Sequence, residues 1–260
     1  MTLLLDQLPA FAAVPGLRHI ISTRPGGVSE GSFASLNLGY HVGDDPARVT
    51  ENRRRLAEAA GYTPDALVAA QQVHGTNLAL VGTAERGQGA FSWEQAIPDT
   101  DGLLVATPGI PVMIQVADCV PVLIVDPRRH VLALVHAGWR GAVGRIASAA
   151  VAQMIARAGT APADLLVGIG PALCPTCLEV GDEVGEVVAR AFGPTAVISG
   201  MTKPHLDLAA ILTADLAGVG VSAAQISASP ACTRCCNDRF FSHRGQRGRA
   251  GRLAMVAWWE

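Results

Sequence analysis

Residues 103–136 read LLVATPGIPVMIQVADCVPVLIVDPRRHVLALVH, and they carry the strongest β-strand signal of the chain. It alternates short apolar, largely β-branched runs with Pro, Asp and Gly, and the runs cover 103–106, 112–116, 120–125 and 131–135. Nearly continuous apolar runs of this length predict strands that are buried on both faces. The sequence therefore predicts a central β-structure with Cys119 and His136 at the ends of neighbouring strands.

Helix and strand signals flank this centre on both sides. Asp45 and Pro46 predict the start of a helix, Gly61 predicts its end, and the Arg triplet 53–55 is expected on its solvated face. The other predicted elements are strands at 17–23, 165–169 and 253–259 and helices at 142–158, 182–191 and 207–217. This pattern indicates an α/β fold with mixed sheets. Since the chain shows no repeat and no long linker, we expect a single domain over residues 1–260.

Composition limits the classes of partner. The chain of 260 residues is half apolar and carries a formal net charge of −2. It can bury a sizeable core, but it has no general attraction for nucleic acid or an anionic membrane. No apolar run reaches the roughly 18 residues that cross a bilayer, and Asp6 comes too early for a secretory signal. We therefore expect a cytoplasmic protein that binds neither nucleic acid nor membranes.

Three potential metal ligands, His74, Cys119 and His136, each lie at the end of a strongly apolar run. Zinc accepts one thiolate and two imidazoles when its fourth position stays open for water or substrate. Zinc with an open position lowers the pKa of bound water to about 7, which gives a hydroxide that can attack an electrophilic carbon. The three residues therefore predict a catalytic zinc site.

Short motifs spread along nearly the whole chain carry a family resemblance. They are STRPGGVS at 22–29, SLNLG at 35–39, QVHG at 72–75, ADC at 117–119, HAGWRG at 136–141, EVG at 179–181 and FFS at 240–242. In this order they resemble the laccase-domain family, also labelled polyphenol oxidase or multicopper oxidase type 1. The resemblance implies an α/β/β/α sandwich in a single domain and zinc bound by His74, Cys119 and His136. It also implies phosphorolysis of adenosine, inosine, guanosine and 5′-methylthioadenosine, with deamination of adenosine.

The same resemblance suggests residues that contact substrate. Arg24, Asn37 and Arg140 occupy motif positions expected to line the pocket, and Arg244 is a further candidate for phosphate. Arg24 and Arg140 suit phosphate because a guanidinium binds two of its oxygens at once. The H-x-E and P-C-x-x-C signature of known zinc deaminases is absent. Asp118, next to Cys119, is therefore our candidate for proton transfer.

Other chemistries use some of the same residues. A metal-free cysteine hydrolase, for example an amidase acting on cell-wall precursors, would use Cys119 as nucleophile, His136 or His74 as base, and Asp118 to orient it. A copper-dependent polyphenol oxidase would need about ten His, mostly in His-x-His pairs, whereas this chain has seven and no such pair. Copper can still occupy the His/Cys/His donors, because it outcompetes zinc in the usual affinity order. A purely structural zinc would require a fourth protein ligand.

Two C-x-x-C pairs, Cys174 with Cys177 and Cys232 with Cys235, are spaced like the halves of a structural zinc knuckle. Cys177 and Cys232 match positions where the family often has Cys, which weakens this signal. A second zinc and a disulfide both stay open. The chain departs from the family pattern at Thr176 and Leu178, where we expect Cys and Tyr. This departure predicts a different pocket wall and leaves the substrate preference open.

Overall fold

The computed structural model describes residues 3–200 and 202–260. Its centre consists of β5 (Gly102–Val105), β6 (Val112–Val116), β7 (Val120–Asp126) and β8 (Val131–Ala137), and every residue of these strands is buried. The predicted buried strands are therefore confirmed. They are divided between two sheets, because β6 pairs with other strands than β5, β7 and β8 do.

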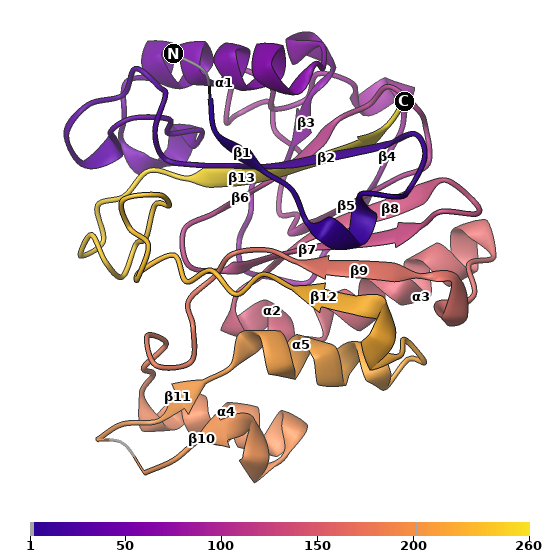
Figure 1. The fold of residues 1–260 in the computed structure, drawn as a ribbon, viewed down its shortest axis with the longest axis vertical. Helices are drawn as coiled ribbons and strands as arrows, with labels where there is room; N and C mark the ends of the chain where they lie inside the picture. The colour runs from indigo at the N-terminus through magenta and orange to yellow at the C-terminus, as the bar shows by residue number, and fades with distance from the viewer. Residues whose placement is uncertain (1–2, 201) are drawn as a thin grey trace.

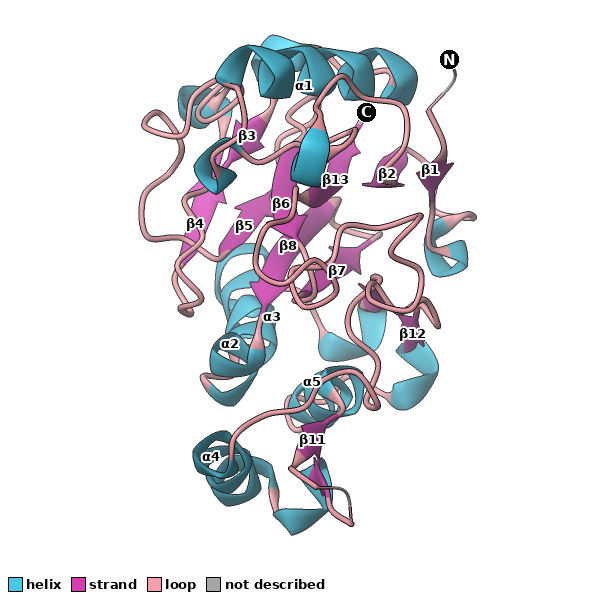
Figure 2. Cartoon of the chain, turned by 90° about the vertical axis from the view of Figure 1, so that its left-hand side faces the viewer, coloured by secondary structure: helices cyan, strands magenta, loops and turns pink. Residues whose placement is uncertain are grey.

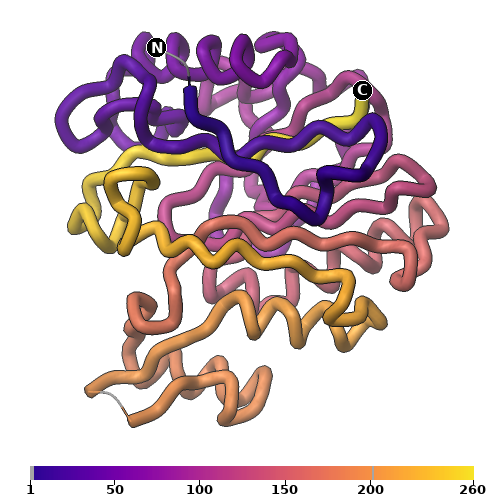
Figure 3. Tube along the Cα trace, in the orientation of Figure 1, coloured from indigo at the N-terminus to yellow at the C-terminus, as the bar shows by residue number. Residues whose placement is uncertain are grey.

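The two sheets are both mixed. Among the described residues, one sheet has the order β1-β2-β13-β6-β3 and the other has the order β12-β9-β7-β8-β5-β4. The strands not yet given are β1 (Leu5–Asp6), β2 (Leu17–Ser22), β3 (Val68–Ala69), β4 (Leu78–Val81), β9 (Leu166–Ile169), β12 (Ile226–Ala228) and β13 (Leu253–Trp259). β13 lies antiparallel between β2 and β6, so the two ends of the colour ramp run side by side in Figure 3.

Helices cover the outer faces of both sheets. The helix α1 (Pro46–Ala60) lies over the first sheet, whereas α2 (Trp139–Val143), α3 (Ile146–Ala158) and α5 (Leu208–Ala217) lie under the second (Figures 1 and 2). The helix α4 (Asp182–Phe192) and the hairpin of β10 (Val197–Ile198) and β11 (His205–Leu206) extend beyond that layer. This arrangement confirms the predicted α/β/β/α sandwich.

Three layers of apolar side chains hold the sandwich together. Adjacent residues of a strand point to opposite faces, so Leu123 packs between the sheets while Val122 packs toward the helices of the second layer. Met113 and Ile114 divide in the same way between the α1 layer and the layer between the sheets. The central strands are buried on both faces for this reason, as their continuous apolar runs predicted.

Local helix signals act as expected in α1. The side chain of Asp45 accepts a hydrogen bond from the N–H of Ala47 at 2.9 Å, Pro46 lies in the first turn, and Gly61 ends the helix at φ 82°.

Within the described part of the chain, no helix combines the length and the apolar composition that crossing a membrane requires.

The expectation that the Arg triplet 53–55 is solvated is wrong for Arg53, which is 2% exposed. Its guanidinium donates to the carbonyl oxygens of Leu38 at 2.9 Å, Gly89 at 2.5 Å and Ala90 at 2.9 Å. Arg54, the next residue, is exposed. Arg53 faces the two loops that contain Leu38 and Gly89, and a buried charge is tolerated when its donors are satisfied by such carbonyls.

The predicted single helix over 142–158 is two helices instead. The helix α2 begins earlier, at Trp139, and α3 begins at Ile146 after a break at Gly144 and Arg145. Arg145 adopts φ 61°, and its side chain donates to Asp215 at 3.1 Å and to the carbonyl of Ala191 at 3.0 Å. These tertiary contacts stabilise a break that helix propensity alone does not predict.

Candidate metal centre and substrate cavity

The three predicted metal ligands meet at one point. His74 lies in the loop between β3 and β4, Cys119 in the turn before β7, and His136 on β8. The antiparallel register of β7 and β8 pairs Pro121 with His136, so the turn containing Cys119 lies at the end of β8. One ligand atom from each of the three residues lies within 4.8 Å of the others. His136 is buried, Cys119 is partly exposed and His74 is exposed, so the centre is accessible from outside.

Asp101, directly before β5, holds both histidine ligands. Its Oδ1 lies 2.7 Å from Nδ1 of His136 and accepts the backbone N–H of His74 at 3.0 Å. Its Oδ2 accepts the N–H of Gly75 at 2.7 Å and that of Val73 at 3.2 Å. The Nδ1 contact leaves Nε2 of His136 as the ligand atom. Sequence reasoning missed Asp101, and its only signal is an acidic residue immediately before a buried apolar run.

Charge coupling prepares Cys119 for metal binding. Burial raises the pKa of Cys119, but the adjacent His136 and His74 outweigh it and bring the pKa down to about 6. Burial lowers the pKa of His136, whereas Cys119 and Asp101 raise it, to about 9. Cys119 is therefore a thiolate near neutral pH, the form that binds metals. A divalent cation would displace the proton of His136, because only a neutral imidazole is a ligand.

Gly138 leaves room for these ligands. A Cβ atom at Gly138 would lie 3.1 Å from Sγ of Cys119 and 3.2 Å from Cδ2 of His74. The backbone of Gly138 is extended, with φ −77° and ψ 179°, so any residue could adopt its conformation. The glycine is needed for space and not for backbone freedom. One thiolate and two imidazoles, with the Asp101 carboxylate on Nδ1 of His136, form a donor set that fits a zinc ion with an open position.

The ligands form part of the lining of a cavity of about 410 Å³, a size typical of small-molecule sites. The wall is part apolar and part basic. Its apolar lining residues include Val116, Trp139, Leu173, Leu178 and Leu208, and its basic and other polar lining residues include His41, Gln72, Gln115, Asp118, Arg140, His243, Arg244 and Arg252. A cavity lined by both apolar side chains and guanidinium groups can bind a flat, hydrophobic ring that carries or accompanies an anion.

Asp118 lines the cavity beside Cys119, and its carboxylate is held in one orientation. Oδ1 accepts from the hydroxyls of Thr233 at 2.7 Å and Ser242 at 2.6 Å, and Oδ2 accepts from the N–H of Arg244 at 2.6 Å. These bonds join the turn before β7 to two segments near the end of the chain. Asp118 therefore holds three segments that surround the cavity together.

Arg24 and Asn37 are placed differently from the other predicted pocket residues. Neither is among the described residues that line the cavity. Arg24 donates to the carbonyls of Ala34 at 2.6 Å and Asn237 at 2.7 Å. Asn37 is fully buried, and its Oδ1 accepts the N–H of Arg252 at 2.8 Å. Asn37 thus positions Arg252, a cavity residue that sequence reasoning did not single out.

Arg140 and Arg244 line the cavity. Arg140 is exposed and its guanidinium lies 4.3 Å from the ring centroid of Trp139. Arg244 is also exposed and donates to the carbonyl of Glu179 at 3.0 Å. Both guanidinium groups keep donors for an anion, because each has five N–H donors and few partners.

Comparison with known proteins places the chain in a family. Residues 18–260 match the sequence model of the family described as multi-copper polyphenol oxidoreductase laccase. The chain belongs to this family. Within the laccase family, it is 41% identical over 250 residues to "Purine nucleoside phosphorylase YlmD" of Geobacillus stearothermophilus, covering 94% of this chain and 90% of that protein. It is 36% identical over 252 residues to "Adenosine deaminase RL5" of an unknown prokaryotic organism, covering 95% and 96%.

A solved structure of a laccase-family protein has the same fold. The crystal structure of YlmD from Geobacillus stearothermophilus aligns with a TM-score of 0.92 and 38% sequence identity, over 97% of this chain and 94% of that one. The resemblance seen in the sequence motifs is therefore confirmed at the level of family and fold.

Proposed function

We propose that the chain is a zinc-dependent purine nucleoside phosphorylase that also deaminates adenosine, with adenosine, inosine, guanosine and 5′-methylthioadenosine as substrates. The observation that carries the proposal is the convergence of His74, Cys119 and His136 on a cavity with both apolar and guanidinium walls. Relatives named purine nucleoside phosphorylase and adenosine deaminase support both activities. His74, Cys119 and His136 would hold the zinc ion, which would supply a Lewis acid to activate water for attack on C6. Copper can occupy the same donors.

The basic wall supplies what phosphorolysis needs. An oxygen of inorganic phosphate attacks C1′ of the ribose, the C1′–N9 bond breaks, and the purine leaves with the bonding electrons and takes up a proton. Arg140, Arg244 and Arg252 line the cavity and are the proposed phosphate and ribose contacts. Arg24 has the proposed role of holding the loop at Ala34 against Asn237.

The apolar wall suits the purine base. Trp139 offers an aromatic face, and Leu178 occupies the wall where the family pattern predicted a Tyr. A leucine there provides contact area without a hydroxyl, which favours substituents that need no hydrogen bond, such as the methylthio group. Asp118, fixed beside Cys119, is the proposed group that moves the proton from the attacking water to the leaving amino group.

A metal-free cysteine hydrolase is the second candidate, and one observation favours it. Cys119, with a pKa of about 6, lies beside His136, which contacts Asp101 at 2.7 Å. This order of thiolate, imidazole and carboxylate also occurs in cysteine hydrolases. The orienting acid would be Asp101 and not Asp118, because Asp101 is the carboxylate that contacts Nδ1 of His136.

Product analysis with adenosine tests the proposal. With phosphate present, the proposal predicts adenine and ribose 1-phosphate, with inosine and hypoxanthine from the deaminase activity. Without phosphate, it predicts inosine alone. The Cys119→Ala protein should form none of these products. If purified protein leaves adenosine unchanged in zinc and phosphate but hydrolyses amide substrates, the second candidate is correct.

A further inference from the structure

The sheet topology brings two distant cysteine pairs together. The strands β9 and β12 are parallel neighbours at one edge of the second sheet. The segments that follow them stay side by side, because Ala172 and Cys232 form a parallel bridge and the N–H of Thr233 donates to the carbonyl of Ala172 at 3.0 Å. Each segment then carries its C-x-x-C pair. The predicted pairs, 58 residues apart in the chain, are thereby placed opposite each other.

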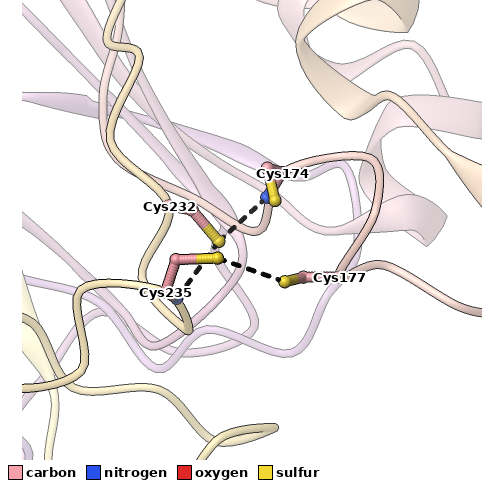
Figure 4. Close-up of side chains that lie close together, drawn as sticks. All are labelled: Cys174, Cys177, Cys232 and Cys235. Carbon is pink, nitrogen blue, oxygen red and sulfur yellow. Dashed lines mark hydrogen bonds between the residues drawn. The ribbon is translucent and has the colours of Figure 1, made fainter.

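The four sulfur atoms converge on one point. Cys174, Cys177, Cys232 and Cys235, here named the four-cysteine cluster, each offer a sulfur within 4.8 Å of the others. Figure 4 shows the two pairs facing each other, with Sγ of Cys177 3.5 Å from Sγ of Cys235. In a tetrahedral zinc site with Zn–S bonds of about 2.3 Å, neighbouring sulfurs lie about 3.8 Å apart. Small side-chain adjustments would bring the cluster to this spacing.

Backbone amides already point at the sulfur of Cys232. The N–H of Cys174 donates to it at 3.3 Å and the N–H of Cys235 at 3.5 Å (Figure 4). Hydrogen bonds of this kind hold a metal-ligand atom in one orientation. In the other pair, the N–H of Cys177 donates to the carbonyl of Cys174 at 2.9 Å and closes a tight turn. Both pairs are therefore built as turns that present two sulfurs in one direction.

We propose that the four-cysteine cluster binds a structural zinc ion, separate from the His74, Cys119 and His136 centre. Four thiolates complete a tetrahedral shell and leave no position for water, which is the arrangement of structural zinc sites. Cys177 and Cys232 are 8% and 6% exposed, while Cys235 is exposed and leaves a route for the ion. The site does not depend on the proposed nucleoside chemistry.

Zinc in the four-cysteine cluster would join two walls of the cavity. The loop of Cys174 and Cys177 continues directly into Leu178, which lines the cavity. The loop of Cys232 and Cys235 contains Thr233, whose hydroxyl donates to Asp118, and the chain continues from there to Arg244. Loss of the ion is therefore expected to loosen both the apolar wall and the Arg244 side of the cavity, and so to raise the KM for nucleoside while the catalytic zinc stays bound.

Metal analysis of the full-length protein tests the proposal. We expect two zinc ions per chain, one in Cys174→Ser or Cys235→Ser, one in Cys119→Ala, and none in the combined variant. Cys236→Ser is the matched control, because Cys236 is adjacent to the cluster in sequence but is not part of it, and it should keep both ions. A single zinc in the unaltered protein that disappears in Cys119→Ala would overturn the proposal.

A second measurement does not depend on folding of the cluster variants. X-ray absorption of zinc-loaded Cys119→Ala protein should show a shell of sulfur alone, at about 2.3 Å. Nitrogen or oxygen in that shell would overturn the assignment. Disulfides are the competing state of the same sulfurs, and they would appear as a mass lower by two hydrogens per bond and as thiols that resist alkylation in denaturant. Iron in place of zinc would colour the protein and would also contradict the zinc assignment.

Discussion

Oδ1 of Asp101 lies 2.7 Å from Nδ1 of His136, and the same oxygen accepts the backbone N–H of His74 at 3.0 Å. One buried carboxylate thus orients the side chain of one metal ligand and the main chain of another. Asp101 is not among the described residues that line the cavity, and it acts through the ligands. Residues in this position typically tune metal affinity as strongly as they tune turnover.

Asp101→Asn should lower zinc affinity about 10- to 100-fold, the usual effect of losing an outer-shell partner. Asparagine keeps the shape but removes the charge that favours the ligating tautomer of His136. Competition with a chromophoric chelator measures the affinity. Asp99→Asn, in the same loop, is the control and should bind zinc normally. Equal affinity of both variants would show that Asp101 supports the fold only.

Gly138→Ala should weaken zinc binding by about tenfold, at the lower end of outer-shell effects. The added methyl group would lie 3.1 Å from Sγ of Cys119 and 3.2 Å from Cδ2 of His74, so both ligands must move. Gly82→Ala is a suitable control, because its Cβ would meet nothing closer than 3.7 Å. Unchanged affinity in Gly138→Ala would mean that the loop of His74 adjusts freely.

Removing the metal should abolish nucleoside turnover, and zinc alone should restore it, because the metal supplies the Lewis acid. A cysteine hydrolase would instead survive a chelator and lose activity on alkylation of Cys119. A copper oxidase would recover only with copper and would consume oxygen. Turnover of a purine nucleoside by metal-free protein would contradict the assignment of His74, Cys119 and His136 as the catalytic centre.

Arg140→Gln should raise the KM for phosphate about tenfold to a hundredfold, since a hydrogen bond to a charged group contributes about 1.5–3 kcal/mol. Deamination of adenosine should change little, because it uses no phosphate. Steady-state kinetics of both reactions measure the difference, and Arg157→Gln on the exposed face of α3 is the control. Parallel loss of both activities would place Arg140 at the nucleoside instead.

Arg53→Ala should lower the free energy of unfolding by about 3 kcal/mol or more, because it leaves buried carbonyl groups without donors. Those carbonyls belong to Leu38, Gly89 and Ala90. Urea denaturation measures the loss, and Arg54→Ala is the control because Arg54 is exposed. A similar small effect in both variants would show that water replaces the guanidinium.

Local signals predicted much of the fold. The cap at Asp45, the stop at Gly61 and the continuous apolar run of β7 depend on neighbours in sequence, and the structure confirms each of them. The break at Arg145 could not be predicted in this way, because its cause is the carboxylate of Asp215, 70 residues away. The prediction that Arg53 is solvated was wrong for the same reason, because its hydrogen-bond acceptors belong to loops distant in the sequence.

The candidate site shows the same division. The ligand types of His74, Cys119 and His136 are visible in sequence, and the structure brings them together. Asp101 was missed, because only the fold shows which of many acidic residues lies behind a histidine. Motif membership alone did not distinguish a residue that lines the cavity, such as Arg140, from one that supports a lining residue. Asn37 is of the second kind, because it accepts the N–H of Arg252.

The pairing of β2 with β13 has a consequence for how the protein assembles. The hydrogen bond from the N–H of Ala254 to Oγ of Ser22 closes a loop of 232 residues. Contacts of such long range cost loop-closure entropy before they return any stability, and they slow folding. During synthesis, the edge of β2 at Ile20 and Ile21 stays unpaired until β13 has left the ribosome, because its partners there are Val256 and Met255. The strands of the second sheet all precede β13, so the first sheet is the part of the nascent chain that stays open to aggregation longest.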